Sequence, residues 1–256
     1  ESSTAAVPVG ARLALGEAGE LSSTLADEPA SAALSWAARS ALGETHPKSR
    51  IVHGEGFEAL LEVIQPAPQL FLFGAGPDAV PVVEFSRAVG FEITVCEANP
   101  RPAVRERFAH LAELYTGSVE SVLPKIEARR SALGVVMSHH YPTDLRALAL
   151  LLESRASYIG VLGPERRTRR MLCELHPNRQ PAEADLARIR APIGLDLGSE
   201  TPTQIALSIV AEMQAVLARA SAEPLSLRSD RPIHAASPEL TVTGAGTARL
   251  ARTGTQ

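Results

Sequence analysis

The fold of this chain is indicated by residues 70–79, which read Leu-Phe-Leu-Phe-Gly-Ala-Gly-Pro-Asp-Ala. Four apolar residues, typical of a buried strand, run directly into a G-x-G-x-x-A turn, and a helical pattern follows. Gly74 allows a sharp turn, Gly76 allows a phosphate to approach the backbone, and Ala79 is small enough for the helix to pack on the strand. The helix N-terminus offers unpaired N–H groups and partial positive charge to an anion. The stretch therefore predicts a phosphate-binding loop that contains Gly74, Ala75 and Gly76.

The next predicted strand carries the acidic residue that accompanies such a loop. Residues 91–96 read as a strand, and Glu97 follows it, 21 residues after the second loop glycine. An acidic side chain at this position binds a ribose diol in dinucleotide-binding domains. Two residues argue against a simple nucleotide site. Pro77 has no N–H group to donate to a phosphate, and Asp78 adds negative charge near the start of the helix. Arg101, four residues after Glu97, is either a ligand for a 2′-phosphate or a solvated arginine.

Short apolar runs alternate with helical stretches around this loop. The predicted strands are at residues 70–73, 92–96, 114–116, 133–138 and 157–162. Strands separated by amphipathic helices form right-handed crossovers and a parallel sheet that is covered on both faces. Residues 202–220 carry a one-sided apolar stripe and predict the last helix. The sequence therefore predicts an α/β fold, with a Rossmann-like parallel sheet in a domain from residue 69 to residue 220.

The region before this domain has a different pattern. Residues 1–66 combine one predicted hairpin, at 11–24, with one helix, at 28–42. One hairpin and one helix make a poor independent core. We therefore interpret this region as a smaller, truncated N-terminal α/β domain whose beginning precedes Glu1, with residues 65–68 as a linker.

Residues 221–256 are rich in Ser, Thr, Ala, Gly and Pro and show little apolar periodicity. This composition predicts a flexible tail. Residues 244–246 copy the start of a nucleotide fingerprint, but no helical stretch follows them, so we expect no second loop there.

Composition and charge exclude several classes of protein. A net charge of −4 argues against nucleic-acid and anionic-membrane partners, and no apolar run approaches the roughly 18 residues of a membrane span. Cys96 and Cys173 lie far apart and match no metal-ligand spacing, so we expect no metal site and a cytoplasmic, reducing location. Lys48 and Lys125 are the two lysines, which leaves little room for a Schiff-base mechanism.

A second group of polar residues follows the fourth predicted strand. Residues 138–144 read Ser-His-His-Tyr-Pro-Thr-Asp. Ligands bind at the carboxyl edge of open parallel sheets, so His139 and Asp144 are candidate catalytic residues that could reach the crevice. The alternative is that a histidine caps the following helix.

Together these motifs resemble the XdhC/CoxI family, which comprises accessory proteins for xanthine dehydrogenase and related molybdenum hydroxylases. The resemblance covers residues 69–220. It includes the glycine loop, the Ser-His-His turn, the run Tyr-Ile-Gly-Val-Leu-Gly at 158–163 and the block Pro-Ile-Gly-Leu-Asp-Leu-Gly-Ser-Glu-Thr-Pro at 192–202. It implies a Rossmann domain behind a smaller N-terminal domain. It also implies that the protein binds molybdenum cofactor, promotes its sulfuration and inserts it into the client enzyme.

The resemblance also implies a set of cofactor-binding residues at the carboxyl edge of the sheet. They are Gly74, Ala75, Gly76, Glu97, Gly160, Gly163, Gly194, Asp196 and Glu200. The loop glycines would cradle a phosphate, and His139, Asp144, Asp196 and Glu200 would surround the pterin or metal side. The implied partners are a molybdenum hydroxylase of the xanthine dehydrogenase type and a cysteine desulfurase, and a homodimer is expected.

The N-terminal region departs from the family pattern. Many members carry a Gly-Gly-Cys element where this chain has Gly-Glu-Leu-Ser at residues 19–22. Because a thiolate is the nucleophile and metal ligand in sulfur chemistry, this absence argues against direct sulfur handling there. Cys96 and Cys173 are expected to pack as small hydrophobic residues.

Two other functions remain open at this point. The same glycine fingerprint fits an NAD(P)-dependent oxidoreductase, and fold alone does not separate the two. In that enzyme His139 or His140 would be the acid–base group, since no tyrosine is followed by a lysine four positions later. A degenerate, non-catalytic binding module is the third hypothesis.

Overall fold

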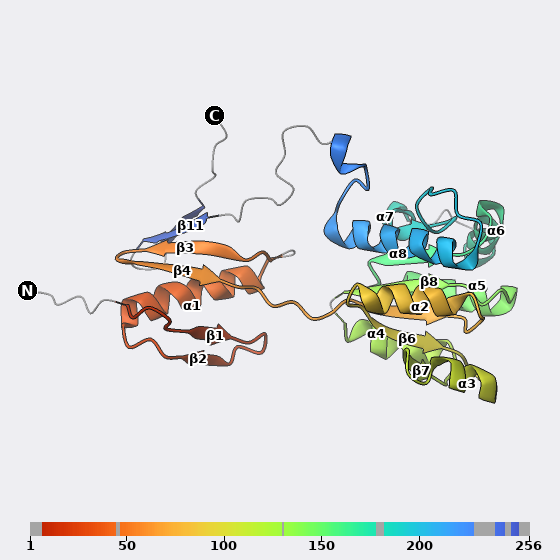
Figure 1. Ribbon diagram of the computed structural model, residues 1–256, viewed down its shortest axis with the longest axis horizontal. Coiled ribbons are helices and arrows are strands. Elements are labelled where there is room, and N and C mark those ends of the chain that lie inside the picture. The colour runs from red at the N-terminus through yellow and green to blue at the C-terminus, as the bar shows by residue number, and fades with distance from the viewer. Residues whose placement is uncertain are drawn as a thin grey trace, which may run out of the picture. The chain divides into compact units, whose positions relative to one another are not determined.

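The computed structural model describes residues 7–44, 47–129, 131–177, 182–227, 239–243 and 247–250. The chain divides into two compact units. The smaller unit comprises Glu1–Gln65 together with Leu225–Gln256, and the larger comprises Pro66–Pro224. Figure 1 shows the helices and strands of each unit.

The larger unit is built on a six-stranded parallel sheet in the part of the chain that is described. The strand order is β10-β9-β8-β5-β6-β7. Their bounds are β5 Gln69–Phe73, β6 Glu92–Cys96, β7 Glu113–Tyr115, β8 Ala132–Val136, β9 Tyr158–Val161 and β10 Ile189–Arg190. Counted from the first strand of this unit, the order is 6-5-4-1-2-3, which is that of dinucleotide-binding sheets. The predicted α/β fold with a Rossmann-like sheet is therefore confirmed.

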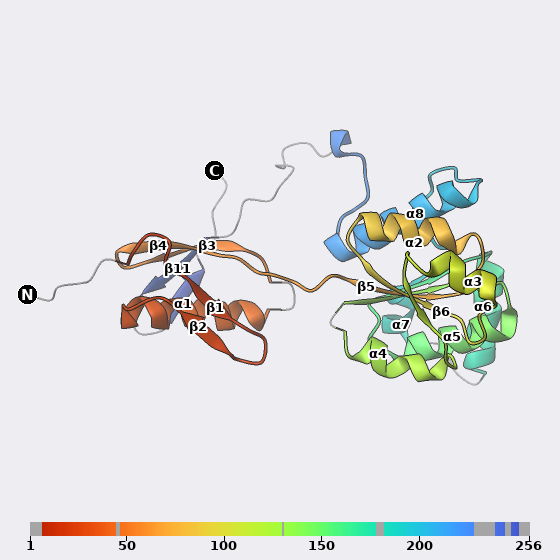
Figure 2. The same cartoon turned by 60° about the horizontal axis from the view of Figure 1, so that its bottom comes forward.

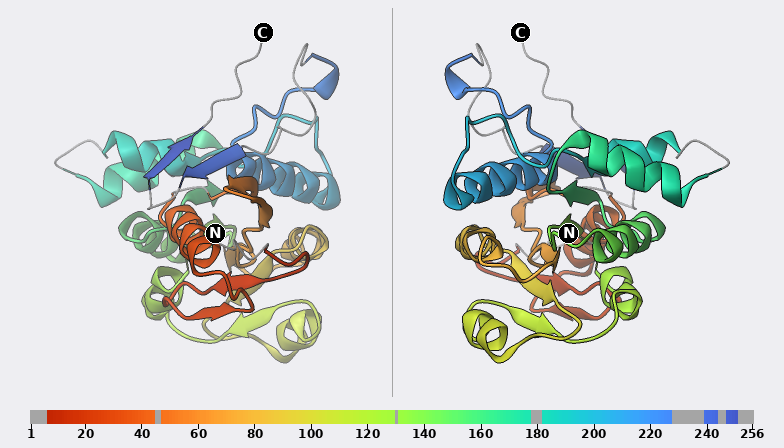
Figure 3. Two further views of the ribbon diagram at one scale, coloured as in Figure 1. Left: turned by 90° about the vertical axis from the view of Figure 1, so that its left-hand side faces the viewer. Right: turned by 90° about the vertical axis from the view of Figure 1, so that its right-hand side faces the viewer.

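Helices cover both faces of this sheet. Figure 2 shows α2 (Ala79–Ala88) and α8 (Pro202–Ala218) on one side, with α4 (Leu123–Glu127) and α5 (Tyr141–Glu153) on the other. Helix α8 runs beside α2, as Figures 1 and 3 agree. The remaining helices of the unit are α3 Pro102–Phe108, the 3-10 turn η1 Glu120–Val122, α6 Glu165–Leu175 and α7 Glu183–Arg188.

Alternation along the strands divides the apolar residues between two cores. Leu70 and Leu72 of β5 pack with α2 and α8, whereas Phe71 and Phe73 pack with α5 on the opposite face. Successive side chains of a strand point to opposite faces, so a strand covered on both sides needs an unbroken apolar run. This requirement explains why β5 reads as a continuous hydrophobic stretch.

Helix α8 begins at a capping box. The side chain of Thr201 accepts a hydrogen bond from the N–H of Gln204, and the Gln204 side chain accepts from the Thr201 N–H at 3.0 Å. The apolar stripe predicted for this helix is buried at Ile209 and Met213, which join the core that also contains Leu70. These two features fix α8 over one face of the sheet.

The smaller unit packs one helix between two sheets. Helix α1 (Glu28–Leu42) begins at Asp27, whose side chain accepts from the N–H of Ala30, and Figure 1 shows it between the β1–β2 hairpin and the second sheet. That sheet has the order β12-β11-β3-β4. The strands are β1 Leu13–Leu15, β2 Leu21–Ser23, β3 Arg50–Gly54, β4 Phe57–Leu61, β11 Glu239–Thr243 and β12 Thr247–Leu250, and η2 (Leu225–Leu227) is a 3-10 turn.

The expectation of a flexible tail over residues 221–256 was wrong for β11 and β12. Strand β11 pairs in parallel with β3, and its Leu240 and Val242 are buried in the core of the smaller unit beside Val52. A run as short as residues 240–243 gives no strand signal without knowledge of its distant partner. Residues 221–227 are described and exposed, with the 3-10 turn η2 at Leu225–Leu227. Residues 228–238, 244–246 and 251–256 of that expectation lie outside the described residues.

Candidate functional site

A cavity of about 400 Å³ lies at the carboxyl ends of the central strands of the larger unit. It opens beside the point where the strand order reverses, between β5 and β8, which is where open α/β sheets bind ligands. Its walls come from β5, β6, the loop after β7, and the start of α5. The lining residues are Phe73, Gly74, Cys96, Glu97, Ala98, Asn99, Gly117, Ser118, Val119, Ser138, Thr143 and Arg146.

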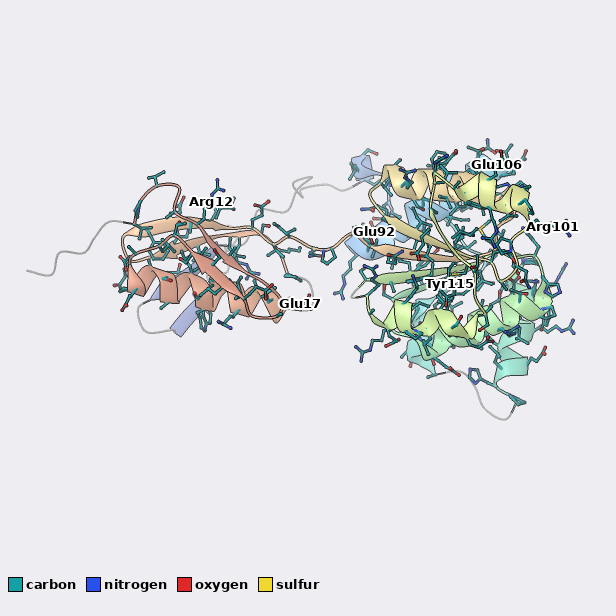
Figure 4. The ribbon with its side chains drawn as sticks, turned by 90° about the horizontal axis from the view of Figure 1, so that it is seen from below. Arg12, Glu17, Glu92, Arg101, Glu106 and Tyr115 are labelled. Carbon is teal, nitrogen blue, oxygen red and sulfur yellow. The ribbon has the colours of Figure 1, made fainter. Side chains whose placement is uncertain are left out.

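The two edges of the sheet can be followed in Figure 4. Glu92 begins β6 and Arg101 follows its carboxyl end, and the two labelled side chains lie at opposite ends of the larger unit. Arg101 and Glu106 both lie toward the end of the larger unit that is opposite to Glu92. The cavity is therefore on the side of the sheet marked by Arg101.

The glycine turn after β5 is packed tightly against the neighbouring loop. Gly74 has a φ of +132°, and a Cβ atom there would lie 2.6 Å from the carbonyl oxygen of Met137. Arg107 of α3 donates to the Ala75 carbonyl oxygen at 2.9 Å. The N–H groups of Ala75 and Gly76 donate to no other described residue, so they remain available to a ligand. Gly76 is less confined, since a Cβ atom there would meet the side chain of Asp78.

A hydrogen bond between two side chains spans the two loops at the switch point. His139 Nε2 lies 2.6 Å from Asp78 Oδ2, and the two side chains are 62% and 26% exposed. His139 has a φ of +59°, a conformation that non-glycine residues seldom adopt. Asp78 makes no capping bond to α2. The pair therefore places a carboxylate and an imidazole where a bound anion would approach the first turn of the helix.

Asp144 does not face the crevice with His139. Its side chain is 1% exposed and accepts hydrogen bonds from the N–H and the hydroxyl of Ser138, at 3.1 and 2.5 Å. It also pairs with Arg167 of α6, with Nη2 2.7 Å from Oδ2. A buried carboxylate with this set of partners holds its neighbours in place. We therefore assign Asp144 a positioning role in the loop between β8 and α5.

The alternative of a helix-capping histidine concerns His140. This residue is the N-cap of α5, but its side chain makes no capping bond. Its Nδ1 lies 2.9 Å from the hydroxyl of Thr143, which lines the cavity. The two histidines thus have different surroundings, and His139 is the one that faces the glycine loop.

Glu97 lies where the sequence pattern places a ribose-binding acid. It follows β6, it is half-buried, and it lines the cavity with Gly74. Its backbone N–H donates to the carbonyl oxygen of Tyr115 at 3.0 Å. The carboxylate therefore sits on a fixed backbone and is available to accept from a ligand.

The later predicted residues do not line this cavity. Gly160 lies under Ile193, where a Cβ atom would clash with that side chain, and the Gly194 N–H donates to Glu212 at 3.0 Å. These glycines serve close packing. Gly163 follows β9 with a φ of +118°, while Asp196 and Glu200 are exposed in the segment before α8.

A buried hydrogen bond, which sequence reasoning missed, anchors that segment. The Tyr158 hydroxyl donates to Glu212 Oε2 at 2.5 Å. Burial, and then the charge of Glu212, raise the pKa of Tyr158 far above its usual range. Tyr158 therefore stays protonated and holds Glu212 of α8 to strand β9.

The two thiols have different environments. Cys96 is 9% exposed at the cavity floor, and burial raises its pKa to about 12. Cys173 is exposed on α6. The expectation that both thiols pack as small hydrophobic residues therefore holds for Cys96 and was wrong for Cys173.

We expect Cys173 to react with a thiol reagent at pH 8 while Cys96 does not, because the thiolate is the reactive form. The measurement is mass spectrometry after iodoacetamide treatment of the folded protein, with Cys173→Ser as the control. Rapid labelling of Cys96 in the folded control would contradict the burial of this thiol.

The described ranges contain neither a helix that could span a membrane nor a cluster of metal-binding side chains. No helix there combines the length and apolar character needed to cross a bilayer. No group of three His, Cys, Asp or Glu side chains in these ranges is arranged to hold a metal ion.

Three of the known proteins that this chain resembles illustrate the comparison. A Bacillus subtilis (strain 168) protein, named as a probable subunit of xanthine dehydrogenase, is 34% identical over 153 residues, which make up 60% of this chain and 44% of that protein. An uncharacterised Escherichia coli (strain K12) protein is 27% identical over 161 residues, or 62% of this chain and 29% of that one. A crystal structure described as a xanthine dehydrogenase from Bacillus halodurans is 33% identical, with a TM-score of 0.53, and the match covers 64% of this chain and 47% of that one.

In each case the match spans less than half of the relative. The family comparison is more direct. Residues 70–213, which include every element from β5 to most of α8, match the family described as the XdhC Rossmann domain. The chain therefore belongs to the XdhC family.

Proposed function

We propose that this protein binds molybdenum cofactor in the cavity, promotes its sulfuration and helps to insert it into a hydroxylase of the xanthine dehydrogenase type. The observation that carries the proposal is the cavity at the switch point, inside the domain that matches the XdhC family. Two relatives whose names mention xanthine dehydrogenase support the choice of client.

The lining side chains fit the chemistry of a pterin phosphate. Glu97 and Asn99 supply carboxylate and amide oxygens that can accept from the N–H edge of a pterin. Thr143 lines the cavity and can donate to a phosphate, as can the N–H groups of Ala75 and Gly76 in the glycine turn beside it, which donate to no other described residue. The bound cofactor would supply the molybdenum centre of the client enzyme, and this chain's residues would hold and orient it.

Sulfur for the cofactor would come from a second protein, which we propose is a cysteine desulfurase. Cys96 is a poor carrier because its raised pKa keeps the thiol protonated at neutral pH. Cys173 is exposed on α6 and does not line the cavity. The chain would then present the cofactor to the donor instead of carrying the sulfur itself.

The competing candidate is an NAD(P)-dependent oxidoreductase. The strand order and the position of Glu97 favour it, because both match dinucleotide-binding sheets. Asp78 opposes it, since its carboxylate lies beside Gly76 at the start of α2, where a pyrophosphate would approach. The same carboxylate also opposes a pterin phosphate at this turn, so it is the family match, and not Asp78, that favours the cofactor proposal.

The deciding experiment incubates the full chain separately with molybdenum cofactor, NAD and NADP. The ligand retained after desalting is identified by mass spectrometry. Retention of the pterin cofactor alone supports the proposal. Retention of NAD or NADP with turnover of a hydride donor, and no retention of the pterin, would overturn it.

We further expect Gly76→Val to weaken binding of the retained ligand by at least about tenfold, on the order of 1.4 kcal/mol. A branched side chain would stand where a phosphate must approach the backbone, while Asp78, the neighbour it meets, can move aside. Circular dichroism checks that the fold is kept, and Gly76→Ala should give a smaller loss. Unchanged affinity in a folded Gly76→Val protein would remove the glycine turn from the site.

A further inference from the structure

We propose that Arg146 is the anion-binding residue of the cavity, that it takes a phosphate-bearing ligand, and that Glu120 competes with this ligand for the same guanidinium. The inference rests on the proposed function in that it uses the same cavity. It adds a residue that no motif assigns and the chemical class of group that this residue binds.

Arg146 reaches the cavity from helix α5. It lies three residues after Thr143, so both side chains are on one face of the helix, and both line the cavity. Its side chain is 55% exposed and does not contribute to either hydrophobic core. The guanidinium is therefore held at the rim of the cavity and is open to a ligand.

The contacts of Arg146 leave donors free. A guanidinium has five N–H groups. Glu120 accepts from Nε and Nη2, each at 2.7 Å, which uses two of the five and leaves three. No other described residue accepts from them. A planar fork with spare donors suits the oxygens of a phosphate, which Arg binds in a bidentate way.

The charges of the lining favour an anion at this end. Of the lining residues named above, two carry a charge, Glu97 and Arg146. Ser138, Thr143 and Arg146 all come from the segment after β8, whereas Glu97 follows β6. A ligand with an N–H edge and a phosphate would match this distribution, with its N–H edge toward Glu97 and its phosphate toward Arg146.

Glu120 is the group that a ligand phosphate must displace. Its hydrogen bond with Arg146 lowers the pKa of Glu120 to about 2, so the carboxylate is ionised at neutral pH. It is 57% exposed and can move into solvent. Removing its charge should therefore strengthen the binding of an anion at Arg146, whereas loss of a residue with a purely structural role would not strengthen binding.

The test compares ligands that differ by a phosphate. Neopterin phosphate and neopterin are followed by pterin fluorescence, and AMP and adenosine by calorimetry, with the full chain at low salt. We expect the phosphate to tighten binding of the pterin, and Arg146→Gln to reduce that gain at least about tenfold. Glu120→Gln should increase it about threefold. Arg155→Gln is the matched control, since Arg155 is 81% exposed, pairs with Glu127 and does not line the cavity.

The two ligand pairs separate the possible sources of the phosphate. A gain that depends on Arg146 for AMP but not for neopterin phosphate supports the anion site and contradicts the pterin function. Retention of molybdenum cofactor with no effect of Arg146→Gln contradicts this inference alone. No phosphate preference in either pair, or equal losses in Arg146→Gln and Arg155→Gln, also overturns it.

Discussion

Gly74→Ala should lower the free energy of unfolding of the larger unit by about 4 kcal/mol. The added Cβ atom would stand 2.6 Å from the Met137 carbonyl oxygen and 2.7 Å from the Ser138 nitrogen, and both are backbone atoms that cannot rotate away. The φ of +132° adds strain for any residue with a side chain. Overpacking and backbone strain each cost ~1–3 kcal/mol, and their sum gives the estimate.

Thermal unfolding followed by circular dichroism measures this effect. A loss of about 4 kcal/mol corresponds to a midpoint about 10 °C lower for a unit of this size. Gly90→Ala is the matched control for strain, because Gly90 has a φ of +91° and no atom within 4 Å of the added Cβ. Equal losses in the two variants would mean that the clash at Gly74 is absorbed, and that the β5 turn does not pack tightly on the loop after β8.

The parts of the fold that sequence predicted are those with a local signal. The apolar run of β5 ends in glycines, and the apolar residues of α8 have helical spacing. Each element can therefore be recognised from a few neighbouring residues. Strand β11 has no such signal. Its burial depends on pairing with β3, which is far away in the sequence, and a four-residue run does not reveal that partner.

In the candidate site, too, the residues that the sequence predicted are those with a local motif. Gly74 and Glu97 were found from a motif and its spacing, and the structure brings both to one cavity. Arg146 was missed because an arginine on an amphipathic helix looks the same in sequence whether it faces solvent or a cavity. Gly160 and Gly194 were assigned to the cofactor, yet their neighbours are Ile193 and Ser208, since a conspicuous glycine serves close packing as readily as ligand approach.

Asp144→Ala should cause the other large loss of stability, because the Asp144 carboxylate joins three elements. It accepts from Ser138 after β8 and from Arg167 of α6, while it lies on α5 itself. Asp144→Ala would leave the Arg167 guanidinium, 23% exposed, without its partner. Breaking a buried pair by removing one member costs about 3–5 kcal/mol, so we expect a loss in that range in urea unfolding.

A double-mutant cycle separates the interaction energy of the Asp144–Arg167 ion pair from the energy lost through poorer packing. Arg167→Met alone should also be costly, because it leaves a carboxylate that is 1% exposed without its cation. Asp144→Ala combined with Arg167→Met should cost clearly less than the sum of the single losses. Glu165→Ala is the control, since its pair with Arg169 is 63% and 72% exposed and should contribute little.

Asp144→Asn separates the positioning role from stability. The amide keeps an oxygen for the N–H of Ser138 but loses the charge that pairs with Arg167, so we expect a smaller loss of stability than in Asp144→Ala. Because Ser138 lines the cavity and precedes His139, the loop should stay in place and ligand affinity should fall less than in Asp144→Ala. If Asp144→Asn abolished binding while remaining as stable as wild type, Asp144 would have to contact the ligand directly, and its role would be catalytic or binding after all.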